Sequence, residues 1–333
     1  MDKITIDSPL DMHLHIRDGE MMENIIRYST TPFSGALIMP NTIPPLTSRQ
    51  EILDYRDRIL KAKGEDSFEP YMSVFFKSSY DYDFLKSIKD IILVVKLYPS
   101  GVTTNSEGGV VSVNLDEVGD TLSAMEKLGI PLSIHGETMG TTFEREAEFL
   151  PTYELLAKTF PRLKIIMEHI SDRRTVRLLD KYPNLYATVT LHHLTITLDD
   201  LLGGALKPHL FCKPIVKTSA DRDALQKLVL SGNPKVMFGS DSAPHPQDKK
   251  ENQNGSAGIF SAPTLLQGIV ELFDKNGKLD LLQNYLSDNA KRIYGVNPPK
   301  KLVTLEKKEM KISESYGGVI PMLAGETLSW SLV

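Results

Sequence analysis

The chain contains a single cysteine, Cys212, among its 333 residues. One thiol cannot build a disulfide framework within a chain, and so few cysteines are typical of proteins that fold in a reducing compartment. The sequence therefore excludes a disulfide-stabilised secreted scaffold and predicts a cytoplasmic protein. Cys212 itself is expected to pack as a small buried hydrophobic residue.

Long hydrophobic runs and a strong charge of one sign are also missing. The longest apolar stretches, such as IILVV at 91–95, are far too short to span a bilayer. The first residues, MDKITIDSPLDMH, contain neither the basic nor the apolar region of a secretory signal. The net charge is only −5, and no basic stripe is interleaved with aromatic residues. These absences argue against a membrane protein and against nucleic-acid binding.

The sequence does contain short apolar segments that alternate with amphipathic ones. Near-continuous apolar strands separated by helices are typical of parallel strands buried on both faces. Helices are predicted over 51–64 and over 219–232, the second with Ser219 as its N-cap. The predicted strands cover residues 10–15, 35–39, 71–77, 91–97, 131–135, 163–169, 185–190 and 235–240.

Eight strand–helix units in a chain of this length favour an α/β fold of the (β/α)8, TIM-type barrel class over an open doubly wound sheet. No G-x-G-x-x-G motif follows the first strand, so a dinucleotide-binding fold lacks its main support. The segment after about residue 298 reads as short strands and turns. We therefore expect one barrel domain over residues 1–333, with 299–333 as a C-terminal extension packed beside the barrel.

His13 and His15 are the first polar residues that suggest chemistry. Strand side chains alternate with period two, so both imidazoles point to the same face and can reach one metal ion. Arg17 continues this spacing on the same predicted strand face. A guanidinium beside a metal site suggests a substrate with a carboxylate or a phosphate. The H-x-H pair alone is a weak signal, because two histidines on a partly exposed strand give the same pattern.

Further potential ligands lie at the ends of predicted strands, namely Lys96, His135, His169 and Asp241. In a barrel these ends converge on one face, where active sites are built. Taken singly, a core histidine, a helix N-cap or a snorkelling lysine would explain each of them. Lys96 is the most informative, because it follows five apolar residues and its ammonium would enter the barrel mouth at a desolvation cost. A metal-bound lysine must lose its charge, either through a lowered pKa or through carbamylation by carbon dioxide.

Three other histidines are interpreted differently. His192 and His193 follow the seventh predicted strand and read as exposed, and His209 precedes the sequence FCKP. We interpret all three as structural or substrate-loop residues rather than as metal ligands.

The distribution of these residues over the strands resembles that of the metal-dependent amidohydrolases. The flanking motifs narrow the resemblance to the dihydroorotases of the shorter bacterial type. Those motifs are DMHLHIRDG, MPNT at 39–42, KLYPSGVTTNSEGGV at 96–110, IHGE at 134–137, EHI at 168–170 and GSDSAPH at 239–245. The resemblance extends from about residue 8 to residue 265.

The resemblance implies a centre of two zinc ions. His13, His15 and Asp241 would hold one zinc, and His135 and His169 would hold the second. Carboxylated Lys96, formed with carbon dioxide, would bridge the two ions together with a hydroxide. Asp241 would also be the catalytic base and then the catalytic acid.

The resemblance also implies the substrate contacts. Arg17, Asn41 and His245 would bind a carboxylate, and backbone groups near Lys213 and Ala257 would hold a pyrimidine ring. A loop with Thr103 and Thr104 would close over the substrate, and its small residues suit a lid. Lys213 departs from the pattern, because an apolar residue is expected there.

The implied activity is that of a cyclic amide hydrolase. It is the reversible cyclisation of N-carbamoyl-L-aspartate to L-dihydroorotate plus water, in de novo pyrimidine biosynthesis. The expected assembly is a homodimer, and the expected partner is the small-molecule substrate.

Two alternatives remain open on the sequence. Hydantoinases and allantoinases share the metal ligands, although a simple hydantoin has no carboxylate for Arg17 and Asn41 to bind. A catalytically silent barrel, retained as a partner in a pyrimidine-synthesis complex, is an alternative of another class. Loss of one ligand would support the silent barrel, and all six are present.

Overall fold

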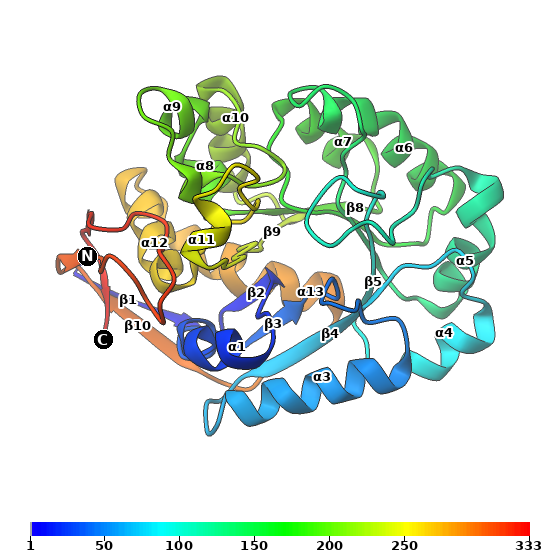
Figure 1. Ribbon diagram of the computed structural model, residues 1–333, viewed down its shortest axis with the longest axis horizontal. Coiled ribbons are helices and arrows are strands. Elements are labelled where there is room, and N and C mark those ends of the chain that lie inside the picture. The colour runs from blue at the N-terminus through cyan, green and yellow to red at the C-terminus, as the bar shows by residue number, and fades with distance from the viewer. Residues whose placement is uncertain (1) are drawn as a thin grey trace.

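The computed structural model describes residues 2–333 and has a parallel eight-stranded barrel at its centre (Figure 1). The strands lie in chain order, and each is parallel to the next. Each overlaps one predicted strand, so the predicted (β/α)8 class is confirmed. The strands are β2 (Leu10–Leu14), β3 (Gly35–Ile38), β4 (Glu69–Phe75), β5 (Val94–Leu97), β6 (Leu132–Ile134), β7 (Ile165–Met167), β8 (Leu185–Val189) and β9 (Val236–Phe238).

The barrel closes where β2 meets the segment after β9. Leu14 pairs with Ser242 in a parallel bridge. The backbone N–H of Asp241 donates to the carbonyl of His13 at 2.8 Å, and that of His15 donates to Ser242 at 3.2 Å. This seam therefore joins the two N-terminal histidines directly to the segment with Asp241.

Helices surround the barrel on its outside (Figure 1). The predicted helices over 51–64 and 219–232 are present as α3 and α10. The N-cap of α10 is Thr218 and not Ser219, because the Thr218 side chain accepts the N–H of Asp221. The helices are α1 (Gly19–Ile25), α2 (Arg27–Thr30), α3 (Arg49–Ala62), α4 (Tyr82–Ile88), α5 (Leu115–Leu128), α6 (Arg145–Thr159), α7 (Val176–Lys181), α8 (Leu191–Thr195), α9 (Leu198–Leu202), α10 (Ser219–Leu230), α11 (Gln247–Lys250), α12 (Leu265–Lys275) and α13 (Asn289–Tyr294).

Two apolar clusters form the core. The larger one packs the helices against the outer face of the barrel. The smaller one takes residues from alternate positions of the strands, among them Met12, Leu37, Val94, Ile166 and Met237, and fills the barrel interior. Because strand side chains alternate, Val94 shares its face with Lys96, so the interior face of β5 leads directly to this lysine.

The chain ends pair with each other beside the barrel. β1 (Lys3–Asp7) is antiparallel to β10 (Leu302–Glu306), and β13 (Ser331–Leu332) pairs with the other edge of β10. A small hairpin consists of β11 (Met310–Lys311) and β12 (Thr327–Leu328). β1 and β10 lie side by side at the left of Figure 1. The assignment of residues 1–333 to one domain, with 299–333 as its extension, stays a prediction.

Among the described residues, no helix combines the length and the apolar character that a membrane crossing requires.

Candidate metal centre and substrate pocket

The carboxyl ends of the barrel strands bring the six candidate ligands together. His13 lies in β2 and Lys96 in β5. His15 and His135 directly follow β2 and β6, whereas His169 and Asp241 lie within three residues of the ends of β7 and β9. A pocket of about 370 Å³ opens at this end of the barrel. Its lining residues are His13, His15, Arg17, Asn41, Tyr98, Thr103, Thr104, His135, His169, Lys213, Asp241, Ala243, Ala257 and Gly258.

His13, His15 and Asp241 form one group of potential ligands, with ligand atoms within 4.8 Å of one another. Asp241 Oδ1 lies 3.1 Å from His15 Nε2 and 3.6 Å from His13 Nε2. Burial opposes ionisation, yet the hydrogen bond from His15 and the charge of His13 hold the pKa of Asp241 well below its usual range. Burial lowers the pKa of His15 to about 4. At neutral pH the group therefore presents an ionised carboxylate and a neutral His15 imidazole, the ligand forms that zinc binds.

His135 and His169 form a second group. Their facing atoms, His135 Nδ1 and His169 Nε2, lie 3.2 Å apart. Burial, followed by the charge of His135, holds the pKa of His169 well below its usual value, so His169 is neutral. The His13 and His169 rings are 4.9 Å apart between centroids, which places the second group directly beside the first.

Lys96 is buried in β5, and no described residue gives its amine a hydrogen-bond partner. Its side chain is 0 % exposed, and its Nζ accepts or donates no hydrogen bond. Nζ lies 5.0 Å from the centroid of the Tyr98 ring. Burial lowers the pKa of Lys96 to about 8, against the opposing charges of Glu168 and Asp241. An unpartnered buried amine with a lowered pKa is the state in which a lysine can react with carbon dioxide.

The donor set fits divalent metal ions. It combines imidazole nitrogens with a carboxylate, the ligands that zinc takes in hydrolytic enzymes. Lys96 Nζ and His169 Nδ1 are buried polar atoms that no protein group satisfies. Such orphaned atoms are rare in folded proteins, and a bound ion or a modification would satisfy them here.

Two buried glutamates form hydrogen bonds with two of the candidate ligand histidines. Glu168 Oε2 is 2.7 Å from His13 Nδ1, and Glu137 Oε2 is 2.6 Å from His135 Nε2. Such carboxylates fix the tautomer and the ring orientation of a metal-binding histidine. Both glutamates lie in the motifs IHGE and EHI, but neither was assigned a role from the sequence. Glu137, two residues after His135, had a local signal, whereas Glu168 contacts the distant His13 and not its neighbour His169.

Backbone conformation also places these side chains. Arg17, His169 and Asp241 have φ of +66°, +38° and +45°, in the left-handed region that side-chain-bearing residues seldom adopt. Such residues cluster at functional sites, where the surrounding structure holds them. Arg17 was expected on the strand face of His15, and this was wrong, because β2 ends at Leu14 and the chain turns before Arg17.

Arg17 nevertheless reaches the pocket beside His245. Arg17 Nη2 lies 3.0 Å from His245 Nε2, and its Nε donates to the carbonyl of Pro244 at 2.9 Å. Asn41 lines the same side, and its Oδ1 is buried without a partner. Of the three predicted carboxylate contacts, Arg17 and Asn41 thus line the pocket, whereas His245 contacts the lining residues Arg17 and Ala257 without lining it itself.

The loop with Thr103 and Thr104 lies over the pocket and is joined to two other walls. Asn41 Nδ2 donates to the carbonyl of Thr104 at 3.1 Å, and Thr104 Oγ1 donates to that of Ala257 at 3.3 Å. His245 Nε2 also lies 3.0 Å from the Ala257 oxygen. Lys213 is partly buried and lines the pocket, and burial lowers the pKa of its ammonium.

Two of the remaining histidines differ from the expectation. His192 and His193 were read as exposed, but they are 0 % and 3 % exposed. They open α8 directly after β8, and the helix turns both rings inward. Cys212 is buried as expected, beside them.

A family model described as Amidohydrolase matches residues 89–296. A dihydroorotase of Helicobacter hepaticus is 46 % identical over 99 % of this chain and 97 % of its own length. A dihydroorotase crystal structure from Campylobacter jejuni has a TM-score of 0.95 at 50 % identity and covers 99 % of this chain and 97 % of that one. A dihydroorotase structure from Saccharomyces cerevisiae, in complex with 5-fluoroorotic acid, has a TM-score of 0.93 at 32 % identity. The match covers 100 % of this chain and 99 % of that one.

The matches to dihydroorotases extend over nearly the whole chain, and they agree with the barrel fold. The chain therefore belongs to the dihydroorotases, cyclic amide hydrolases of the amidohydrolase family.

Proposed function

We propose that the chain interconverts N-carbamoyl-L-aspartate and L-dihydroorotate in pyrimidine biosynthesis, with two zinc ions and a carboxylated Lys96. The observation that supports it best is Lys96, a fully buried amine near the carboxyl end of β5 that has no hydrogen-bond partner among the described residues. His13, His15 and Asp241 would hold one ion, and His135 and His169 the other. Lys96 would bridge the two after carboxylation.

When bound, the two ions would polarise the amide carbonyl and lower the pKa of the attacking water. The protein supplies the remaining parts of the reaction. Arg17, Asn41 and His245 would bind the substrate carboxylate and so orient the ring. Guanidinium suits this role, because its planar fork matches a carboxylate. Backbone groups at Lys213 and Ala257 would hold the ring itself.

Asp241 would move the proton. Its carboxylate is ionised at neutral pH and lies in the pocket, so its free oxygen can accept a proton in the hydrolytic direction. It then returns that proton to the leaving ring nitrogen. In synthesis the same transfers run in reverse order. Thr103 and Thr104 would cover the bound substrate and exclude bulk water.

Activity on substrates with and without a carboxylate tests this proposal. The metal-loaded enzyme should hydrolyse dihydroorotate and cyclise carbamoyl aspartate, whereas hydantoin, allantoin and dihydrouracil should be poor substrates. A chelator should abolish activity, and zinc should restore it. Comparable turnover of hydantoin and dihydroorotate would contradict the assignment, and absence of all turnover in a protein with two bound metals would favour a silent barrel.

We also propose a cytoplasmic homodimer. The single cysteine supports the reducing compartment. Light scattering on the purified chain measures the assembly directly, and a mass of one chain at micromolar concentration would contradict the dimer.

A further inference from the structure

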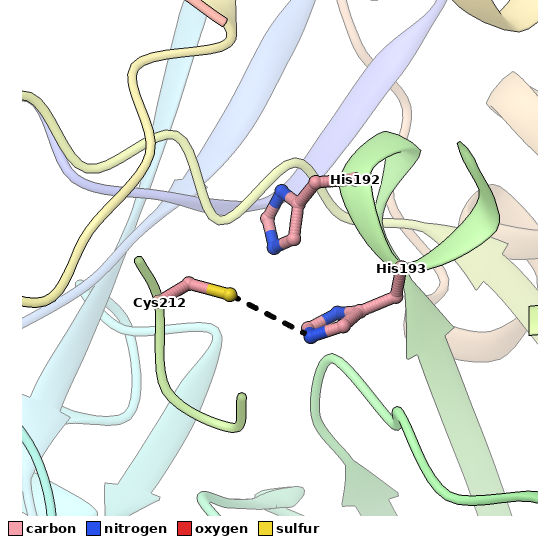
Figure 2. Close-up of side chains that lie close together, drawn as sticks. All are labelled: His192, His193 and Cys212. Atoms are coloured by element: carbon pink, nitrogen blue, oxygen red, sulfur yellow. Dashed lines mark hydrogen bonds between the residues drawn. The ribbon is translucent and has the colours of Figure 1, made fainter. Parts of the chain in front are cut away.

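His192, His193 and Cys212 lie together outside the residues that line the substrate pocket (Figure 2). Their potential ligand atoms all lie within 4.8 Å of one another, and all three side chains are buried. Cys212 Sγ is 3.9 Å from His193 Nε2. Figure 2 shows the His192 ring turned towards the other two side chains.

His192 is the unusual member of this cluster. It is 0 % exposed, and within residues 2–333 neither Nδ1 nor Nε2 has a hydrogen-bond partner. A neutral imidazole carries one donor and one acceptor, and buried polar groups are nearly always satisfied. A fully buried ring with two unsatisfied nitrogens, directed at a thiol and a second imidazole, therefore indicates a missing ligand.

We propose that His192, His193 and Cys212 form a third metal site, which binds one Zn²⁺ ion. A thiolate and two imidazoles are the donors that zinc prefers, and three protein ligands leave a fourth position for water. This site would be separate from the pocket that holds the other two ions.

The spacing of Cys212 and His193 needs only a small contraction. With Zn–S of about 2.3 Å and Zn–N of about 2.0–2.1 Å, tetrahedral ligands lie about 3.3–3.6 Å apart. The observed separation of Cys212 Sγ and His193 Nε2 is 3.9 Å. A side-chain movement of a few tenths of an ångström brings these two atoms to ligand spacing.

The surrounding hydrogen bonds permit the required protonation states. His193 Nδ1 lies 3.0 Å from Thr190 Oγ1, and His193 Nε2 lies 3.0 Å from the carbonyl of Pro214. The contact with the Pro214 carbonyl is a hydrogen bond only while Nε2 carries the proton. Metal binding therefore requires the proton to move to Nδ1, where His193 can donate to Thr190, and Nε2 to exchange the Pro214 carbonyl for the metal. Cys212 Sγ donates to the same Pro214 carbonyl at 3.2 Å.

Metal binding replaces a proton on sulfur. Burial raises the pKa of the Cys212 thiol to about 12, so the free protein contains the thiol form. As the sulfur–metal bond forms, the S–H proton leaves to solvent, and the metal charge stabilises the thiolate. His192 and His193 stay neutral, because burial holds the pKa of each below its usual value.

The site would also affect the substrate pocket. The two histidines open α8, directly after β8, while Cys212 precedes the pocket residue Lys213. A metal shared by these two segments would fix the 212–214 backbone against the barrel. The substrate ring would then meet a more rigid wall at Lys213.

Cobalt titration of the metal-free, full-length protein tests the site. Cys212 is the single cysteine, so a thiolate-to-cobalt charge-transfer band in the near ultraviolet reports this site alone. We expect the band to saturate with one cobalt per chain, in addition to the cobalt in the pocket, and zinc should displace it. Cys212→Ser should abolish the band.

His192→Gln is the decisive variant, because the His192 side chain makes no hydrogen bond whose loss would unfold the protein. Mutation of a residue that merely hydrogen-bonds a metal ligand typically lowers metal affinity by about 10–100-fold. Loss of the ligand His192 itself should therefore weaken the cobalt binding that this band reports by at least about tenfold. His209→Gln is the matched control, since His209 pairs with exposed Glu251. Absence of the band at saturating cobalt, or equal affinity in His192→Gln and wild type, would overturn the proposal.

Discussion

Glu137 and His135 form a buried hydrogen bond, with 2.6 Å between Glu137 Oε2 and His135 Nε2. Both side chains are at most 3 % exposed. Burial alone would raise the pKa of Glu137, but the hydrogen bond and charge of His135 hold it below its usual range. An ionised Glu137 requires the proton on Nε2, so His135 turns the lone pair of Nδ1 towards His169.

Glu137→Gln should therefore weaken metal binding at His135 and His169 by about tenfold or more. Glutamine keeps the shape but removes the charge that fixes the tautomer. Metal affinity, measured by competition with a chelator, checks this. Glu144→Gln is the control, because Glu144 is half exposed and pairs with Arg174. Equal affinities in the two variants would show that Glu137 does not position His135.

Lys96→Ala should remove most activity together with one or both metals, because the proposed bridge between the ions is lost. Short carboxylates such as acetate or propionate should restore part of the turnover by filling the space of the carboxylated side chain. Metal analysis and steady-state kinetics on one preparation measure both effects. Two bound metals and full turnover in the variant would exclude the bridging role.

Asp241→Asn should keep the fold and lower turnover by about 10²-fold or more, the scale of general acid–base catalysis. Asparagine still offers an oxygen to a metal, but it cannot take up and return a proton. The variant should be compared with wild type at matched metal content. If turnover then stays near the wild-type value, another group moves the proton.

Arg17→Ala should raise KM for dihydroorotate and carbamoyl aspartate by about 10–100-fold. The rise follows because the variant loses one charge-assisted hydrogen bond to the substrate carboxylate, which contributes roughly 1.5–3 kcal/mol to binding. Metal content should not change. Dihydrouracil has no carboxylate, so its already poor turnover should respond little. An equal loss on dihydrouracil would mean that Arg17 supports the pocket structurally through Pro244 and His245.

His245 should make the protein less stable in acid. Burial, followed by the charge of Arg17, lowers the pKa of His245 to about 3 in the folded state. An unfolded histidine titrates near 6.5, so below that pH the unfolded chain binds the extra proton. Stability contributed by His245 is thus present above pH 6.5 and is lost as pH falls towards 3.

Urea unfolding of the metal-free protein at pH 7 and pH 5 measures this effect. The free energy of unfolding should fall by about 1–2 kcal/mol more in wild type than in His245→Gln. The difference between the two proteins isolates His245 from the other buried histidines, which titrate in both. The same loss in both proteins would show that His245 titrates normally in the folded state.

The barrel was predictable because its signals are local. Continuous apolar runs such as IILVV at 91–95 mark strands buried on both faces, and the residues that end these runs meet at one rim of the barrel. Lys96 and His135 could therefore be placed at the pocket from their strand positions alone. Their exact ligand roles still came from the resemblance and stay predictions.

Features that depend on contacts between distant segments were not predictable. The hydrogen bond that Glu168 accepts from His13 joins the residue after β7 to β2 across 155 residues, and no local pattern reports it. His192 and His193 were misread as exposed for the same reason, because α8 is only five residues long and its orientation depends on its neighbours. The turn at Arg17 depends on a left-handed backbone that a strand pattern does not reveal.

The seam between β2 and the segment after β9 has a consequence for biosynthesis. Asp11 accepts hydrogen bonds from Ser240, 229 residues later in the chain, right beside His13 and Asp241. The proposed ligands of the first metal therefore belong to segments that leave the ribosome far apart in time. A nascent chain can assemble His135 and His169 early, but it gains the first metal position only after Asp241 has emerged. Premature termination anywhere before the last barrel strand thus yields a product that cannot load both ions.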